Sequence, residues 1–123
     1  MADKFVEEWP DVLHREGKTL MRLFSDPDGN KIGPAIKGEN PVFYNPAMSR
    51  SRTRSVLLMQ YAIENELLGD DLIYAVDGLS ATGLRARRWL NELPQESAER
   101  IKATIIDMNQ FALDLALKTH EEF

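Results

Sequence analysis

The segment that most constrains this chain is an apolar run at 72–76, followed at once by a turn of small residues at 77–83 and a helix-forming segment at 84–90. This order predicts a buried strand, a tight turn and a helix. The free N–H groups at the start of such a helix point to one spot beside the positive end of the helix dipole. The turn therefore predicts a site for a small anionic or nucleotide-like ligand, and Gly83 would let that ligand approach the backbone closely.

A second strand is expected at 102–106, after a helix over 84–93 that stops before Pro94. The three elements make a βαβ unit of an α/β domain, in which 72–76, apolar on both faces, would be a central parallel strand. Ligands of open α/β sheets bind outside the carboxyl ends of the strands, where a carboxylate can accept the hydroxyl hydrogens of a ribose. Asp107, at the end of the second strand, has that place, although it could instead cap the following helix.

Two further helices are expected from three- and four-residue spacing of apolar side chains. One begins at Pro46, capped by Asn45, and runs to about Leu68. Its buried stripe would consist of four apolar residues: Val56, Met59, Ile63 and Leu67. The other covers 108–117, and its buried face would carry Met108, Phe111 and Leu115.

The N-terminal region carries weaker signals. Residues 1–15 are expected to form a short lead-in, helical if ordered, with His14 at the surface. A strand is expected at 18–24, and the turn signal at 25–30 favours a β-hairpin or β-arm. We therefore divide the chain into an N-terminal lead-in and β-arm over 1–41 and the main α/β part over 42–123.

Composition limits the chemistry that one domain of 123 residues can perform. With no cysteine and two isolated histidines, we expect no metal site. No run of about 18 apolar residues occurs, so we expect a cytoplasmic protein without a membrane partner. The net charge of −5 argues against wholesale coating of nucleic acid, and the arginines at 50–54 would most often form a solvated face. A second basic cluster lies at 85–88.

The central turn does not match three known motifs, and each mismatch argues against one class of ligand or reaction. Gly78 and Gly83 have the spacing of a phosphate-binding Walker loop, but Leu-Arg follows where that loop needs Lys and Ser or Thr. A dinucleotide fingerprint would need glycine at Ser80. A hydrolase elbow would be one residue shorter, and no histidine follows except His120. Ser80 is therefore interpreted as a turn hydroxyl.

What remains is an acid at the end of each strand, Asp77 and Asp107, and a turn of small residues between the first strand and its helix. Such an arrangement can hold a cofactor built from adenosine and an amino acid, and S-adenosylmethionine fits that demand. Asp77, Ser80 and Gly83 would then belong to the cofactor site.

Two separate motifs resemble those of the tRNA guanine dimethyltransferase family. The first is Val-Phe-Tyr-Asn-Pro at 42–46 with Met48 and then Arg52, and the second is Asp-Gly-Leu-Ser-Ala-Thr-Gly-Leu-Arg at 77–85. Glu-Gly-Lys at 16–18 also fits the family's opening β-arm. The resemblance covers the chain from about residue 16 onward. It implies an S-adenosylmethionine-dependent, Rossmann-like fold that dimethylates the exocyclic amine of a guanosine, typically at position 26 of tRNA.

The resemblance also implies roles for single residues. Arg52 would contact the carboxylate of the cofactor as a charge-assisted donor. Arg85 would lie at the same site, and Asp107 would hold the adenosine ribose. The sequence departs from the family pattern at Thr53, where an acid is usual, and at Thr82, where a serine is usual.

Complete members of this family are expected to continue to a catalytic Asp-Pro-Phe-Gly block and a tRNA-binding domain, and neither follows here. We therefore expect an incomplete methyltransferase fold that binds the cofactor, lacks catalytic residues of its own, and needs a C-terminal half or partner chain. Its exposed sheet edge predicts association. The alternatives are a non-catalytic α/β interaction module and a tRNA-binding module that uses the arginines at 50–54.

Overall fold

The computed structural model describes residues 9–24 and 41–123. Its centre is the expected βαβ unit: strand β3 (Ile73–Gly78), helix α3 (Leu84–Glu92) and strand β4 (Ile101–Ile106). The two strands pair in parallel, from Ile73 opposite Ile101 to Gly78 opposite Ile106. A short helix, α4 (Gln95–Ala98), lies in the connection between α3 and β4. The carboxyl ends of both strands therefore lie side by side at the same end of the sheet, as expected.

Of the predicted lead-in, the structure describes residues 9–15, and these contain a strand from residue 12 onward rather than a helix. Strand β1 (Val12–Glu16) pairs antiparallel with β2 (Thr19–Leu23) around a two-residue turn. The predicted turn at 25–30 lies outside the described residues. Alternate residues of β1 face inward, but the inward set includes His14 and the buried Glu16, which hides the strand pattern in the sequence.

The helix predicted from Pro46 begins as expected and ends early. Asn45 accepts a hydrogen bond from the Ala47 N–H at 3.0 Å and caps the 3-10 turn η1 (Pro46–Met48). Helix α2 (Ser49–Glu64) follows directly. Beyond it Glu66 adopts a φ of 56°, which breaks the helix, and Leu67 is 65% exposed rather than part of the buried stripe.

Helix α5 (Gln110–Glu122) extends further than predicted. Asn109 caps it, with its side-chain oxygen accepting the Ala112 N–H at 3.3 Å. Leu115 is buried as expected. Met108 precedes the cap and is 99% exposed, so its assignment to the buried face is wrong.

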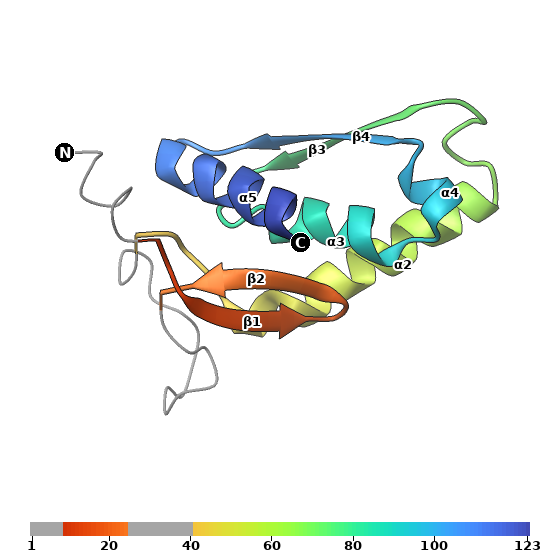
Figure 1. Ribbon diagram of the computed structural model, residues 1–123. Helices are drawn as coiled ribbons and strands as arrows, with labels where there is room; N and C mark the ends of the chain where they lie inside the picture. Colours follow the sequence, from red (N-terminus) through yellow and green to blue (C-terminus); the bar gives the residue numbers. More distant parts are fainter. Residues whose placement is uncertain (1–8, 25–40) are drawn as a thin grey trace.

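The elements form layers, with the β3–β4 sheet on one side, α3 and α5 in the middle, and the hairpin with α2 on the other side (Figure 1). The main core joins α2, α3 and the sheet through aliphatic side chains and Trp89: Val56, Ile63, Ile73, Ala86, Trp89, Leu93 and Ile101. No helix of the described residues is long and apolar enough to cross a membrane.

The opposite face of the sheet is uncovered. Tyr74 and Val76 of β3 are 78% and 62% exposed, and Ile106 of β4 is also exposed. Within the described residues both outer edges of this two-stranded sheet are unpaired. Lys102 and Thr104 of β4 lie beside the two β3 residues and are exposed on the same face, which is therefore only partly apolar. Parallel sheets are almost always covered on both faces.

We predict that Gly83→Ala destabilises the fold more than Gly69→Ala. Both glycines have positive φ, +67° and +79°, a backbone cost of about 1 kcal/mol for alanine. A Cβ at Gly83 would also lie 2.8 Å from the Cβ of Ala116 in α5, whereas no atom lies within 4 Å at Gly69. Urea denaturation should therefore show an extra loss of about 1–2 kcal/mol for Gly83→Ala. Equal losses would contradict this packing.

Candidate functional site

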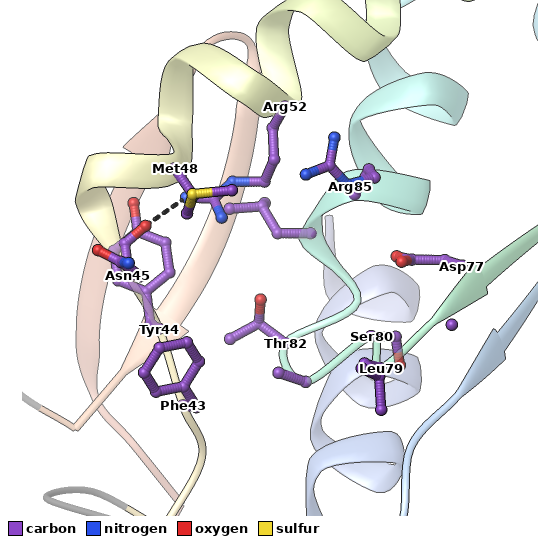
Figure 2. A pocket seen from close by; sticks show the side chains of 13 residues that line it. Phe43, Tyr44, Asn45, Met48, Arg52, Asp77, Leu79, Ser80, Thr82 and Arg85 are labelled. Carbon is purple, nitrogen blue, oxygen red and sulfur yellow. Dashed lines mark hydrogen bonds between the residues drawn. The ribbon is translucent and has the colours of Figure 1, made fainter. Parts of the chain in front are cut away.

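A cavity of about 190 Å³ lies between the start of α2, the segment that leads into it and the turn after β3 (Figure 2). Two residue groups far apart in the sequence line it. The first group comes from the α2 side: Phe43, Tyr44, Asn45, Met48 and Arg52. The second comes from the β3–α3 turn: Asp77, Gly78, Leu79, Ser80, Ala81, Thr82, Leu84 and Arg85. The fold therefore brings the two sequence motifs to the same cavity.

The turn wall of the cavity has an unusual backbone. Leu79 and Ala81 adopt φ values of 55° and 45°, a region that non-glycine residues rarely enter. Two hydrogen bonds hold the turn, from the Ser80 N–H to the Ile106 carbonyl at 2.8 Å and from the Gly83 N–H to the Ser80 carbonyl at 2.7 Å. Each strained residue costs on the order of 1 kcal/mol, and such strain clusters at ligand-binding sites.

Ser80 differs from its interpretation as a turn hydroxyl. Its backbone groups make the turn, whereas its Oγ is buried and has no hydrogen-bond partner among the described residues. Leaving a buried hydroxyl unpaired costs about 1–3 kcal/mol. Ser80 lines the cavity, so a ligand with a polar group could satisfy this hydroxyl.

Asp77 places a carboxylate at the edge of the cavity and is itself buried. One of its oxygens accepts the N–H of Ala86 at 3.3 Å, near the start of α3. Burial raises the pKa of Asp77 above its ordinary value. The Ala86 hydrogen bond and the charges of Arg85 and Arg52 oppose the increase, and the charge of Asp107 adds to it. The fold thus keeps a poorly compensated negative charge at this position.

Arg85 lines the same cavity and is anchored to α2. Its guanidinium donates to the carbonyl and the Oγ of Ser51, each at 3.2 Å. Figure 2 shows Arg52 on α2 and Arg85 on α3, with Asp77 at the end of β3. The site therefore offers both signs of charge to one ligand.

Asp107 and Gly83, both expected at the cofactor site, do not line the cavity. Asp107 accepts the Ala81 N–H at 2.8 Å and the Asn109 N–H at 2.9 Å, which ties the turn to the end of β4. It does not cap α5, because Asn109 does. Gly83 begins α3 and faces Ala116. Both residues shape the turn, and their role toward a ligand stays a prediction.

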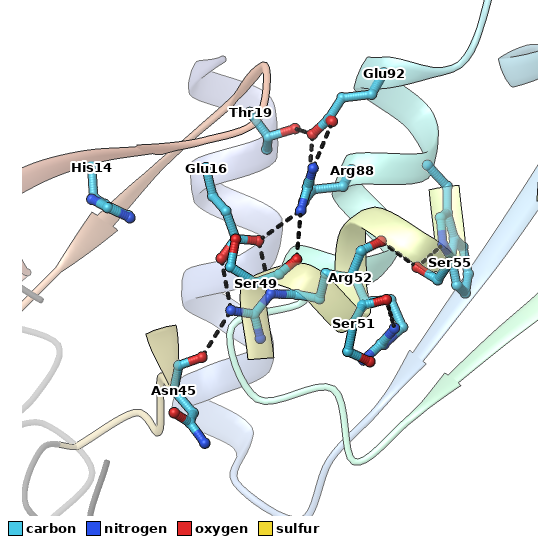
Figure 3. A network of polar contacts seen from close by, with 12 residues as sticks. His14, Glu16, Thr19, Asn45, Ser49, Ser51, Arg52, Ser55, Arg88 and Glu92 are labelled. Carbon is cyan, nitrogen blue, oxygen red and sulfur yellow. Dashed lines mark hydrogen bonds and ion pairs between the residues drawn. The ribbon is translucent and has the colours of Figure 1, made fainter. Parts of the chain in front are cut away.

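Arg52 is buried, so its expected place on a solvated face is wrong, whereas Arg50 and Arg54 are exposed. Its Nε and Nη2 donate to the two oxygens of Glu16 at 2.8 and 2.7 Å. Arg88 of α3 donates to the same carboxylate at 3.1 Å and forms an ion pair with Glu92 (Figure 3). We call Glu16, Arg52, Arg88 and Glu92 the arm cluster.

The arm cluster was missed from the sequence because its members are spread from residue 16 to residue 92. Burial alone would raise the pKa of Glu16, but the hydrogen bonds and charges of Arg52, together with Tyr44 and Arg88, hold it below its ordinary value. The Glu16 carboxylate is therefore ionised throughout the neutral range. In the sequence, the Glu-Gly pair at 16–17 indicated the β-arm, but it did not indicate which residues pair with Glu16.

No group of three or more His, Asp or Glu residues in the described ranges could hold a metal ion. The charged residues that line the cavity are two arginines and one aspartate. They suit an organic ligand that carries both a negative and a positive group.

Comparison with known proteins agrees with both motifs. The family model for N2,N2-dimethylguanosine tRNA methyltransferase matches residues 21–120. A tRNA (guanine(26)-N(2))-dimethyltransferase of Pyrobaculum neutrophilum is 36% identical over 76% of this chain and 26% of its own. The enzyme of the same name from Methanothermobacter thermautotrophicus is 35% identical over 84% of this chain and 23% of its own. No solved structure gives a significant match. The chain thus spans about a quarter of the length of these relatives.

We predict that Asp77→Asn stabilises the fold at neutral pH by about 1 kcal/mol, because it removes a buried charge and keeps an acceptor for Ala86. The raised pKa means that the folded chain binds this proton more tightly than the unfolded chain. The penalty is therefore full at neutral pH and disappears as the pH falls toward about 4.

Denaturation at several pH values should show this gain shrinking in acid. The carboxylate of the exposed Asp71 accepts the Leu72 N–H, so Asp71→Asn offers the control variant, with an expected change below about 0.5 kcal/mol. A loss of stability in Asp77→Asn at pH 7 would contradict the electrostatic assignment.

Proposed function

Because this chain belongs to the N2,N2-dimethylguanosine tRNA methyltransferase family, we propose that its cavity binds S-adenosylmethionine for transfer of a methyl group to tRNA. The single observation that carries the proposal is the convergence of Arg52 and Asp77 on one cavity beside the β3–α3 turn. The βαβ unit would then be the front of a Rossmann-like sheet, with its ligand at the carboxyl ends of the strands.

The residues present fit this cofactor by charge and by hydrogen bonding. Arg52 would bind the carboxylate of its amino acid part, and Asp77 would attract its positive charges. The unpaired Oγ of Ser80 offers a further hydrogen bond to its polar groups. Asp107 would accept the ribose hydroxyls with the lone pairs that its two backbone partners leave free. When bound, the cofactor supplies an electrophilic methyl group.

For the substrate, we propose the exocyclic amine of a guanosine in tRNA, at position 26 as in the names of the relatives. Methyl transfer requires that amine to be held in line with the methyl group, with an acceptor to orient it. We assign no described residue to that step. Since the chain spans about a quarter of its relatives, we propose that the catalytic and tRNA-binding groups come from the remaining three quarters of the fold.

A second candidate, a non-catalytic interaction module, is favoured by the uncovered sheet. Tyr74, Val76 and Ile106 expose an apolar face, and the two strand edges are free in the described part of the chain. The occupant we propose is a segment with further strands and helices of the same methyltransferase fold, because the length that the relatives have beyond this match could supply it. Cofactor binding separates the two candidates, since only the first requires it.

Isothermal titration of the whole chain with S-adenosylmethionine should show binding to one site. Asp107→Ala should weaken it at least tenfold, because the variant loses both the ribose acceptor and the anchor of the turn at Ala81. Asp114→Ala is the matched control, since Asp114 is exposed on α5 and bonds only Gln110. No heat with the folded wild-type chain would overturn cofactor binding and leave the interaction module.

Transfer to tRNA is tested by mixing this chain with the remaining three quarters of the Pyrobaculum neutrophilum relative. We expect labelled methyl groups to reach a tRNA transcript with guanosine 26 and not one with adenosine there. Val76→Glu on the uncovered face should prevent this methylation of the guanosine 26 transcript, because it places a charge where an apolar partner would pack. Methylation of the adenosine transcript at an equal rate would contradict the proposed substrate.

A further inference from the structure

Glu16, at the end of β1, is only 4% exposed, and hydrogen bonds occupy the acceptor sites of its carboxylate. Oε1 accepts the Tyr44 hydroxyl at 2.9 Å and Arg52 Nη2 at 2.7 Å. Oε2 accepts Arg52 Nε at 2.8 Å and Arg88 Nη1 at 3.1 Å. Four donors saturate the roughly four acceptor sites of a carboxylate, so Glu16 has no capacity left for a ligand.

Arg52 is bound through Nε and Nη2 and is open at Nη1. Its Nε and Nη2 bond Glu16, and Nη2 also donates to the carbonyl of Asn45 at 2.9 Å. Its guanidinium lies over the ring of Tyr44, 5.2 Å from the centroid. Among the described residues, Nη1 has no hydrogen-bond acceptor, and Arg52 lines the cavity. Figure 2 shows the side chain reaching from α2 into the cavity beside Met48.

We propose that Glu16 is a positioning residue, which holds Arg52 so that its unused Nη1 group receives the carboxylate of the cofactor. This inference rests on the proposed function of the cavity. The Glu16 and Asn45 contacts use Nε and both hydrogens of Nη2, which leaves the two N–H donors of Nη1. Because the guanidinium is planar, holding its Nε–Nη2 edge also fixes the direction of the Nη1 donors. Glu16 therefore acts through Arg52 and touches no ligand itself.

The rest of the arm cluster fixes Glu16 in turn. Arg88 is held by both oxygens of Glu92, at 2.6 and 2.9 Å, and Thr19 of β2 donates to Glu92 at 2.9 Å (Figure 3). The hairpin turn approaches this pair so closely that a Cβ at Gly17 would lie 2.5 Å from Arg88 Nη2 and from Glu92 Oε1. The β-arm is thereby locked onto α3 at the point where it supplies Glu16.

Charge sharing leaves Arg52 attractive to an anion. The single charge of Glu16 is divided between Arg52 and Arg88, and the latter has its own partner in Glu92. Asp77, the carboxylate that lines the cavity, bonds the Ala86 N–H instead, and its interaction with Arg52 is through charge only. The cavity side of Arg52 is thus incompletely neutralised, as a carboxylate site requires.

Two ligands that differ in one carboxylate test the proposal: S-adenosylmethionine and its decarboxylated form. The whole wild-type chain should prefer S-adenosylmethionine. In Glu16→Gln we expect its affinity to fall at least tenfold, while that for the decarboxylated ligand changes less than twofold, so the preference is lost. Glu122→Gln is the matched control, because it breaks the partly exposed ion pair with Arg22, which is not part of the arm cluster or of the cavity, and leaves Arg52 and the preference intact.

Three outcomes would overturn the inference: an unchanged preference in Glu16→Gln, an equal loss for both ligands, or the same loss of preference in Glu122→Gln. If Glu16→Gln does not fold, Glu16→Asp decides, because it keeps the charge and is too short for the two-point contact with Arg52. An unchanged preference in Glu16→Asp would overturn the inference. Failure of the wild-type chain to bind either ligand would refute the proposed function instead, and the inference with it.

Discussion

The structure depends on one buried carboxylate, Glu16, that two arginines from different helices share. It joins the β1–β2 hairpin to α2 through Arg52 and to α3 through Arg88. Removing one partner of such a buried pair leaves an uncompensated charge, which costs on the order of 3 kcal/mol. The same contacts place the edge of Arg52 at the cavity. In the proposed function, stability and ligand recognition would therefore rely on the same group, and a hairpin distant in sequence would matter to the site.

The β3–α3 turn differs from the arm cluster, because several of its features lower the stability of the fold. Leu79 and Ala81 have strained φ values, the Oγ of Ser80 is buried without a partner in the described residues, and Asp77 keeps a buried charge. Folding alone gives no reason for these costs, whereas a polar, charged ligand would relieve several of them. Their concentration in one turn is the physical argument that it is a binding site rather than a plain connection.

The βαβ unit and the Asn45 cap could be predicted from the sequence because local signals determine them: an apolar run, a turn of small residues, and a capping residue before proline. The structure of β1 could not be predicted in this way, because the burial of the inward-facing Glu16 depends on hydrogen bonds from arginines that lie 36 and 72 residues away. The same long-range pairing buries Arg52, which local reasoning placed on a solvated face. For the site, the two motifs contain the residues that line the cavity, but Gly83 and Asp107 of the predicted site do not line it. The contact between Glu16 and Arg52 could be found only from the fold.

The central claim is that Arg52, held by Glu16, receives the carboxylate of a cofactor in this cavity. The most direct measurement is a crystal structure of the whole chain with S-adenosylhomocysteine, the product form of the cofactor. The account predicts the ligand carboxylate on the Nη1 side of Arg52, at about 2.7–2.9 Å, with the Glu16 contacts intact. A ligand bound elsewhere, or an Arg52 that leaves Glu16 to reach it, would contradict the account.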